Sequence, residues 1–214
     1  MKILIIAAHP DDEVLGVGGT VCRHVAQNDE VYVCIVTKAH EPEWTAEYIE
    51  TKKKEQREVD KLLKIKKRFN LNLLTTCLNT IPHGKLNKMI YEVVNEINPD
   101  IVYTHFENDL NHDHTLVFRA SMVATRPPRR IKLLCFETLS ETEWNNKTFQ
   151  PNIWVDIKDY MNTKIKAFKI YSTEVKAYPH PRSEEGIRVL SKKRGSEACF
   201  EYAESFMLVR DYIK

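Results

Sequence analysis

Three short apolar runs stand out in the pattern of hydrophobic and polar positions. They cover residues 3–8 (Ile-Leu-Ile-Ile-Ala-Ala), 31–36 (Val-Tyr-Val-Cys-Ile-Val) and 101–104 (Ile-Val-Tyr-Thr). Runs of this length, two of them rich in β-branched residues, are typical of strands that are buried on both faces of a sheet. The pattern therefore predicts at least three internal strands.

Helix-length stretches separate these runs. A glycine-rich turn at residues 16–19 precedes a helical stretch at 20–28, and two further helical stretches flank residues 71–76. Strands that alternate with helices predict a mostly parallel sheet with right-handed crossovers. We therefore expect an α/β fold of Rossmann-like type, with helices on both sides of the sheet.

The helical stretch at 47–68 has an unusual inward face. At helical spacing this face reads Ile49, Lys52, Gln56, Val59 and Leu63, so polar residues interrupt an apolar stripe. Either this end of the helix is solvated, or Lys52 points into a cleft. The other charges of the stretch, interspersed in sign, favour a solvated helix face over a nucleic-acid patch.

The later part of the chain continues the same organisation. Met161, Ile165 and Phe168 form a plain core stripe, and Ser183 followed by two glutamates marks the start of another helix. There is no linker, composition break or internal repeat. We therefore expect one domain over residues 1–214.

Composition and charge exclude several classes of protein. The formal net charge is +2, from 32 basic and 30 acidic residues, which is too small to demand nucleic acid or an anionic membrane as partner. No run approaches the roughly 18 apolar residues of a membrane span. The five cysteines are widely spaced without a CxxC pair, which fits neither a disulfide framework nor a thiolate zinc site. We expect reduced thiols and a cytoplasmic location, and leave a homo-oligomer open.

A dense polar cluster, His9-Pro-Asp11-Asp12-Glu13, follows the first predicted strand. Open α/β sheets bind their ligands at the carboxyl ends of strands. Three adjacent carboxylates raise one another's pKa unless a cation compensates, so a metal ion is the simplest reason for this sequence. The alternative is that Asp11 or Asp12 caps a helix and its neighbours are solvated.

A second cluster follows the third predicted strand, at residues 105–114 (His-Phe-Glu-Asn-Asp-Leu-Asn-His-Asp-His). His114 lies three residues before Val117 of the next helix, so in the first turn it faces the sheet and could meet His9 and Asp12. A single histidine in this position is more often a hydrogen-bonded structural residue than a metal ligand. Two clusters that offer nitrogen and oxygen ligands, but no thiolate, favour a catalytic zinc with an open coordination position.

At this point the sequence resembles the PIG-L/LmbE-like zinc-dependent N-deacetylases. That family is marked by His-Pro-Asp-Asp-Glu near the N-terminus, matched here by residues 9–13, and by an Asp-His pair entering a later helix, matched by Asp113 and His114. The segment His180-Pro-Arg-Ser183 is similar to a late element of the family. The resemblance runs over nearly the whole chain.

The resemblance implies a role for each matching residue. His9, Asp12 and His114 would ligate one Zn²⁺ per chain, Asp11 would act as the base, and Asp113 would orient His114 from behind. Zinc with two neutral imidazoles and one carboxylate keeps a net charge of about +1, which acidifies a bound water towards a pKa of roughly 7. The implied reaction is removal of an N-acetyl group from an N-acetylglucosamine-type sugar in a small conjugate.

A position in the second motif departs from the family pattern. Many members have a second histidine three residues before the zinc histidine, taken to stabilise the oxyanion and protonate the leaving amine. Here that residue is Asn111, which can donate a hydrogen bond but cannot titrate. His105, His112 and His180 are alternatives for the acid, with His105 nearest a strand end. Asp11 could also return the proton alone, and we favour that scheme.

The candidate substrate-binding residues are less specific. Lys52 stands about where relatives use an arginine, and His83, beside Gly84, stands where relatives have an acidic residue. Arg182 follows Pro181, which suits a residue held at the mouth of a site, although a surface arginine would look the same. We include His180 with these three.

Four functions remain open, of which the fourth is a basic nucleic-acid module with salt-sensitive binding of DNA or RNA. The first is the amino-sugar N-deacetylase, with a small molecule as partner and no nucleic acid or membrane. The second is a zinc amidase acting on another N-acylated amine. The third is a sugar- or metal-binding homologue without catalysis, for which Asp11 would have no use.

Overall fold

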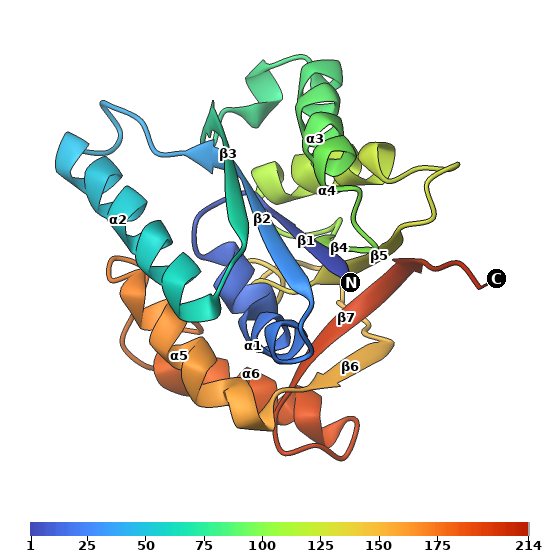
Figure 1. Cartoon of the computed structure of the whole chain (residues 1–214). Coiled ribbons are helices and arrows are strands. Elements are labelled where there is room, and N and C mark those ends of the chain that lie inside the picture. Colours follow the sequence, from blue (N-terminus) through green and yellow to red (C-terminus); the bar gives the residue numbers. More distant parts are fainter. Residues whose placement is uncertain (214) are drawn as a thin grey trace.

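Over residues 1–213, the computed structural model forms a seven-stranded sheet with helices on both faces (Figure 1). The strands are β1 (Lys2–Ala7), β2 (Glu30–Lys38), β3 (Lys67–Leu74), β4 (Ile101–His105), β5 (Lys132–Phe136), β6 (Ile153–Asp156) and β7 (Ala203–Arg210). The α-helices are α1 (Asp12–Ala26), α2 (Ala46–Leu63), α3 (His83–Ile97), α4 (His112–Ala124), α5 (Met161–Ile170) and α6 (Glu184–Ser196). Two short 3-10 helices are η1 (Leu78–Thr80) and η2 (Lys158–Tyr160).

The sheet is mostly parallel, as the alternation of strands and helices predicts. Its order is β3-β2-β1-β4-β5-β7-β6, and β7 is antiparallel to both of its neighbours. The chain moves outward from β1 through β2 to β3, and then returns to place β4 on the other side of β1. The point between β1 and β4 is therefore the topological switch point, where such sheets form their ligand crevice.

Helices cover the two faces of the sheet unequally. On one face the core packs α1, α2, α5 and α6 against the strands, with Val14, Val59, Phe168 and Ile187 buried in it. On the other face α3 and α4 cover the sheet. In the part of the chain that the structure describes, no helix combines the length and apolar character needed to cross a membrane.

The first helix begins earlier than the sequence pattern predicts. The expected glycine-rich turn at 16–19 lies inside α1, which already starts at Asp12. The glycines let this helix approach its neighbours closely: a Cβ at Gly16 would lie 2.3 Å from the ring of Phe136, and one at Gly19 would lie 2.8 Å from Ile157. Close packing explains these residues better than a turn does, and it brings the polar cluster of residues 9–13 directly onto the sheet edge.

Two other local predictions are resolved by the structure. Ser183 caps α6, where its hydroxyl accepts the backbone N–H of Gly186 at 2.9 Å. The polar residues on the inner face of α2 are not solvated, because Lys52 and Gln56 are both buried. They line a cleft instead.

Candidate active site

The two polar clusters meet at the switch point. β1 and β4 are paired in parallel, so the loops after both strands open at the same edge of the sheet. The first loop carries His9 and runs into α1 at Asp12. The second ends at Asn111, whose side-chain oxygen accepts the backbone N–H of Asp113 at 3.0 Å and caps α4. This cap places His114 in the first turn, facing the sheet edge.

Three side chains form a nearly equilateral triangle there. His9 Nδ1 lies 3.2 Å from His114 Nε2, and Asp12 Oδ2 lies 3.3 Å from each of these nitrogens. A tetrahedral zinc with nitrogen and oxygen ligands at about 2.0–2.1 Å separates its ligand atoms by about 3.3–3.4 Å. The three residues thus form a group that could hold a metal ion.

A second carboxylate supports each imidazole from behind. Asp113 Oδ2 lies 3.2 Å from His9 Nε2, and Asp109 Oδ2 lies 2.9 Å from His114 Nδ1. Each contact suits a proton on the outer nitrogen, so that loss of the inner proton would direct a lone pair into the triangle, as metal-binding histidines require. The expectation that Asp113 orients His114 is corrected: Asp113 orients His9, and Asp109 orients His114.

The protonation behaviour of the triangle also suits a cation. Burial alone would lower the pKa of the imidazoles, but hydrogen bonds to Asp113 and Asp12 raise the pKa of His9 to about 9. In the same way, Asp12 and Asp109 raise the pKa of His114 to about 10 against burial. Burial would raise the pKa of Asp12, yet His114 and His105 hold that pKa well below its usual value. The surrounding carboxylates make this a site for positive charge.

One further observation tests the fit of a metal. Asp12 Oδ1 is buried and has no hydrogen-bond partner among residues 1–213. Buried carboxylate oxygens are normally satisfied, so an unpaired one beside two imidazole nitrogens is what a metal-binding carboxylate would leave. The donor set of two imidazoles and one carboxylate also fits a catalytic zinc.

Asp11 lies beside the triangle in an unusual backbone conformation. Its φ is 119°, which for a non-glycine residue costs about 1–3 kcal/mol. Glu13 offsets this strain, because Glu13 Oε2 accepts the backbone N–H of Asp11 at 2.9 Å. Arg68 and Tyr171 in turn donate to Glu13 Oε1. A buried hydrogen-bond network therefore holds the Asp11 backbone.

The Asp11 carboxylate is positioned by Arg182. Arg182 Nη1 donates to Asp11 Oδ2 at 3.0 Å and its side chain is only 15% exposed, so Arg182 is not a freely solvated surface arginine. Burial raises the pKa of Asp11 to about 8, and the Arg182 guanidinium opposes this rise. A carboxylate with a raised pKa beside a metal-binding group is suited to moving protons.

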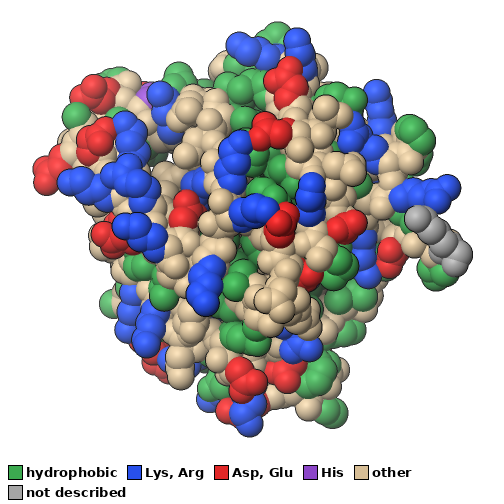
Figure 2. Space-filling model, in the orientation of Figure 1, with side chains coloured by type: hydrophobic (Ala, Val, Ile, Leu, Met, Phe, Trp, Pro, Cys, Tyr) green, Lys and Arg blue, Asp and Glu red, His purple; other side chains and the backbone are tan. Residues whose placement is uncertain are grey.

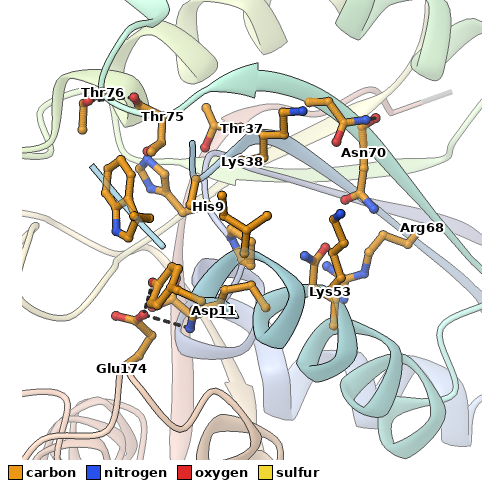
Figure 3. Close-up of a pocket in the computed structure, with 18 of the residues that line it drawn as sticks. His9, Asp11, Thr37, Lys38, Lys53, Arg68, Asn70, Thr75, Thr76 and Glu174 are labelled. Atoms are coloured by element: carbon orange, nitrogen blue, oxygen red, sulfur yellow. Dashed lines mark hydrogen bonds and ion pairs between the residues drawn. The ribbon is translucent and has the colours of Figure 1, made fainter. Parts of the chain in front are cut away.

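A cavity of about 710 Å³ opens in front of these residues (Figure 3). His9, Thr75 and Thr76 stand at one end, with Asp11 on its floor, whereas Lys53, Arg68 and Asn70 lie towards the other end. This volume is in the upper part of the range of roughly 300–1,000 Å³ that is typical of small-molecule sites. The cavity can accommodate more than the group that reacts.

Lys52 is directed into this cavity from α2. Its Nζ lies 2.8 Å from Glu174 Oε1 and 3.2 Å from Glu55 Oε2, above the rings of Tyr48 and Tyr171. Glu174 also accepts the hydroxyl of Tyr48 at 3.0 Å. The wall next to Asp11 thus carries fixed charges of both signs, which suits binding of a hydroxyl-rich ligand.

Similarity to known proteins identifies the family of this chain. A family model described as "PIG-L: GlcNAc-PI de-N-acetylase" matches residues 4–125, more than half of the sequence. The chain belongs to the PIG-L family. This PIG-L chain is similar to YaiS, an uncharacterized deacetylase of Escherichia coli (strain K12), with 34% identity over 176 residues that cover 78% of this chain and 88% of the relative.

Two other relatives of the PIG-L chain have named substrates. A Bacillus anthracis protein described as "Probable N-acetyl-alpha-D-glucosaminyl L-malate deacetylase 2" is 25% identical over 186 residues, which cover 80% of each chain. The structure of an N,N'-diacetylchitobiose deacetylase from Pyrococcus horikoshii superposes with a TM-score of 0.79, covering 97% of this chain and 83% of the other at 22% identity. At that identity the superposition shows a shared fold.

The remaining candidate residues of this PIG-L chain lie in different places. Asn111 lines the cavity, with its oxygen used by the helix cap and its amide NH₂ group left as a donor. His105 is fully buried behind His114, and its Nε2 accepts the backbone N–H of Ala8 at 2.8 Å. It lies beneath the cavity and does not reach across it. His112 is exposed on α4.

His83 and His180 are not among the residues that line the cavity. His83 begins α3, away from the triangle. His180 Nδ1 accepts the backbone N–H of Arg182 at 3.0 Å, and its ring meets Trp144 edge-on. His180 therefore shapes the turn that carries Arg182.

The structure adds site residues that the sequence analysis did not select. Glu141, from the loop after β5, lines the cavity near Arg182, and its pKa is raised by burial. Glu174 comes from the segment between α5 and α6. Neither residue has a motif or spacing that relates it to His9 or His114, so only the folded chain identifies them. Asp109 carried a weak signal, because it belongs to the second polar cluster.

Proposed function

We propose that this PIG-L chain is a zinc-dependent hydrolase that removes the N-acetyl group from an N-acetylglucosamine-type amino sugar in a small conjugate. The observation that carries the proposal is the triangle of His9 Nδ1, Asp12 Oδ2 and His114 Nε2, with edges of 3.2–3.3 Å, at the end of a cavity that also contains Asp11. His9, Asp12 and His114 would hold one Zn²⁺.

Zinc bound there would supply a Lewis acid that polarises the acyl oxygen and acidifies water. The chain's own residues perform the proton transfers. Asp11 removes a proton from the attacking water as its oxygen bonds to the acyl carbon, and Arg182 keeps the Asp11 carboxylate turned towards that position. The Asn111 amide donates a hydrogen bond to the acyl oxygen as negative charge develops on it.

The same proton then completes the reaction. Asp11 delivers it to the amide nitrogen and the carbon–nitrogen bond breaks, which releases acetic acid and a primary amine; transfer of the remaining water proton from the acid to the amine gives acetate and an ammonium group. Asp11 acts as both base and acid in this scheme, because His105 is buried with its Nε2 already occupied by a backbone N–H. Asn111 cannot titrate.

The amino-sugar assignment has separate support. The names of the relatives describe deacetylases, and two of these names specify N-acetylglucosamine-type compounds. Lys52, Glu174 and Arg182 give the wall of the cavity charged donors and acceptors, which suit sugar hydroxyls.

An amine-release screen tests the proposal. The zinc-loaded protein is incubated with N-acetylglucosamine conjugates, including chitobiose, thiol-precursor and sugar-nucleotide forms, and the new primary amine is quantified. We expect release from at least one conjugate, and loss of that activity after chelation with recovery on adding zinc. Release from non-sugar N-acyl amines alone would indicate the related amidase, and release from no compound would indicate a binding protein.

A further inference from the structure

The charged residues that line the cavity are distributed unevenly along its length. The end next to the triangle carries Asp11, Glu141 and Glu174 together with Lys52 and Arg182. The rest of the lining, which we call the distal lobe, is formed by α2, the last residue of β2 and the first half of β3. Its lining includes Lys38, Lys53, Gln56, Arg57, Arg68 and Asn70.

Positive charge is in excess in the distal lobe. Four of its lining side chains are cationic, whereas Asp60 is the anionic one. Asp60 is bound to Arg68, with Arg68 Nη2 at 2.6 Å from Asp60 Oδ1. Lys53 pairs with the exposed Glu50. Lys38 and Arg57 have no ion-pair partner within residues 1–213. Figure 2 shows Lys and Arg side chains gathered on the face of the molecule over α2.

Two buried polar atoms of the lobe are also unpaired. Gln56 Oε1 and Arg68 Nη1 have no hydrogen-bond partner within the described residues. The Arg68 side chain is only 5% exposed and reaches from β3 towards the cavity (Figure 3). A buried acceptor and a buried donor left unpaired on the wall of one cavity indicate a polar ligand, because such groups are costly unless something binds them.

The position of the lobe relates it to the proposed reaction. It belongs to the same continuous cavity as His9 and Asp11, and the cavity is larger than one acetylated sugar ring requires. A sugar whose acetamido group lies at the triangle therefore directs the rest of its conjugate along α2.

We infer that the distal lobe binds the aglycone of the substrate, and that this aglycone carries a carboxylate or phosphate group. Lys38 and Arg57 attract the anion at the rim, and Arg68 Nη1 and Gln56 Oε1 bind polar groups of the linker. This inference rests on the proposed function for the sugar end of the cavity. It adds that anionic conjugates are preferred over neutral ones.

Three matched glycosides of N-acetylglucosamine test the inference: those of glycerol, glyceric acid and glycerol phosphate. They share a three-carbon aglycone and differ in its charge. With the zinc-loaded protein, we expect kcat/KM for at least one anionic glycoside to exceed that for the glycerol glycoside by about 10-fold. Added salt should reduce this preference, since the rim cations are exposed. The better of the two anionic compounds identifies carboxylate or phosphate.

Single substitutions locate the effect. Arg57→Gln and Lys38→Gln should each raise KM for the preferred anionic glycoside by about 3- to 10-fold and leave kcat unchanged, because binding away from the reacting bond is lost. KM for the glycerol glycoside should not change. Lys54→Gln is the matched control: it removes the same charge from an exposed position of α2 that does not line the cavity.

Equal kcat/KM for the three glycosides would overturn the inference, and so would equal effects of Arg57→Gln and Lys54→Gln on KM for the anionic glycoside. Neither result would contradict the proposed deacetylase activity. If no glycoside releases amine, the proposed hydrolysis fails instead. Calorimetric binding of the same three compounds then tests the lobe by itself. Tighter binding of an anionic compound that Arg57→Gln weakens supports the lobe, and equal binding rejects it.

Discussion

Arg182 Nη1 donates to Asp11 Oδ2 at 3.0 Å, although the two residues lie 171 positions apart in the chain. The contact fixes the carboxylate that we propose as base and acid. Asp11→Asn should keep the metal and lower kcat by about 10²- to 10⁴-fold, the usual contribution of a positioned proton-transfer group. Arg182→Gln should cause a smaller loss, and Arg182→Lys should restore part of it.

Metal content and amine release are measured on the same preparations. Asp11→Asn turning over substrate at the unsubstituted rate would show that the base lies elsewhere.

The metal-binding triangle gives a second prediction. His9→Ala, Asp12→Ala and His114→Ala should each deplete the protein of the roughly one zinc per chain that three ligands and a water would hold. Elemental analysis after dialysis measures this. His112→Ala is the control, since it removes an exposed imidazole two residues from His114. Undiminished zinc in all three triangle variants would reject the ligand assignment.

The third prediction concerns Asp109. Its Oδ2 lies 2.9 Å from His114 Nδ1, so Asp109→Asn should weaken zinc binding by about 10- to 100-fold through loss of the orienting carboxylate. Competition with a chromogenic chelator measures the affinity. Asp113→Asn should act similarly through His9, 3.2 Å away. Zinc affinity unchanged in Asp109→Asn would mean that the imidazole is oriented by other contacts.

His105 provides the test of which group protonates the amine. In His105→Ala the backbone N–H of Ala8 loses its buried acceptor, so the free energy of unfolding should fall by about 1–3 kcal/mol. We expect kcat to fall modestly and its dependence on pH to keep the basic limb, because Asp11 supplies the proton. A profile without that limb, at unchanged zinc content, would make His105 the acid.

The last prediction addresses packing of α1. A Cβ at Gly16 would lie 2.3–2.9 Å from ring atoms of the buried Phe136, so Gly16→Ala should destabilise the fold by about 1–3 kcal/mol. Gly84→Ala is its counterpart, because nothing lies within 4 Å of a Cβ there. It should stabilise by about 0.4–1 kcal/mol. Urea unfolding compares the two, and equal midpoints would contradict the packing explanation.

Much of the fold could be predicted because its central strands are buried on both faces. The apolar runs at 3–8, 31–36 and 101–104 correspond to β1, β2 and β4. The edge strand β3 has only exposed and partly buried positions, so its sequence does not form an apolar run. The start of α1 was misplaced because glycines that allow close helix packing look like a turn in sequence.

Some residues of the candidate site could also be predicted from the sequence, and others could not. His9, Asp12 and His114 could be expected to meet because each follows a central parallel strand, and such strands end at one edge of the sheet. The partners of the two imidazoles could not be assigned from spacing. Asp113 follows the helix cap and turns towards the loop after β3, where the Thr76 N–H binds it. Asp109 precedes the cap and lies under His114.

The place of β7 in the sheet affects how the protein is made. It pairs with β5 on one side and β6 on the other, yet both of those strands are synthesised before it. Until residues 203–210 leave the ribosome, β5 has an open edge and β6 lacks its partner. Nascent chains should therefore expose the unpaired edges of β5 and β6 until β7 is available to pair with them.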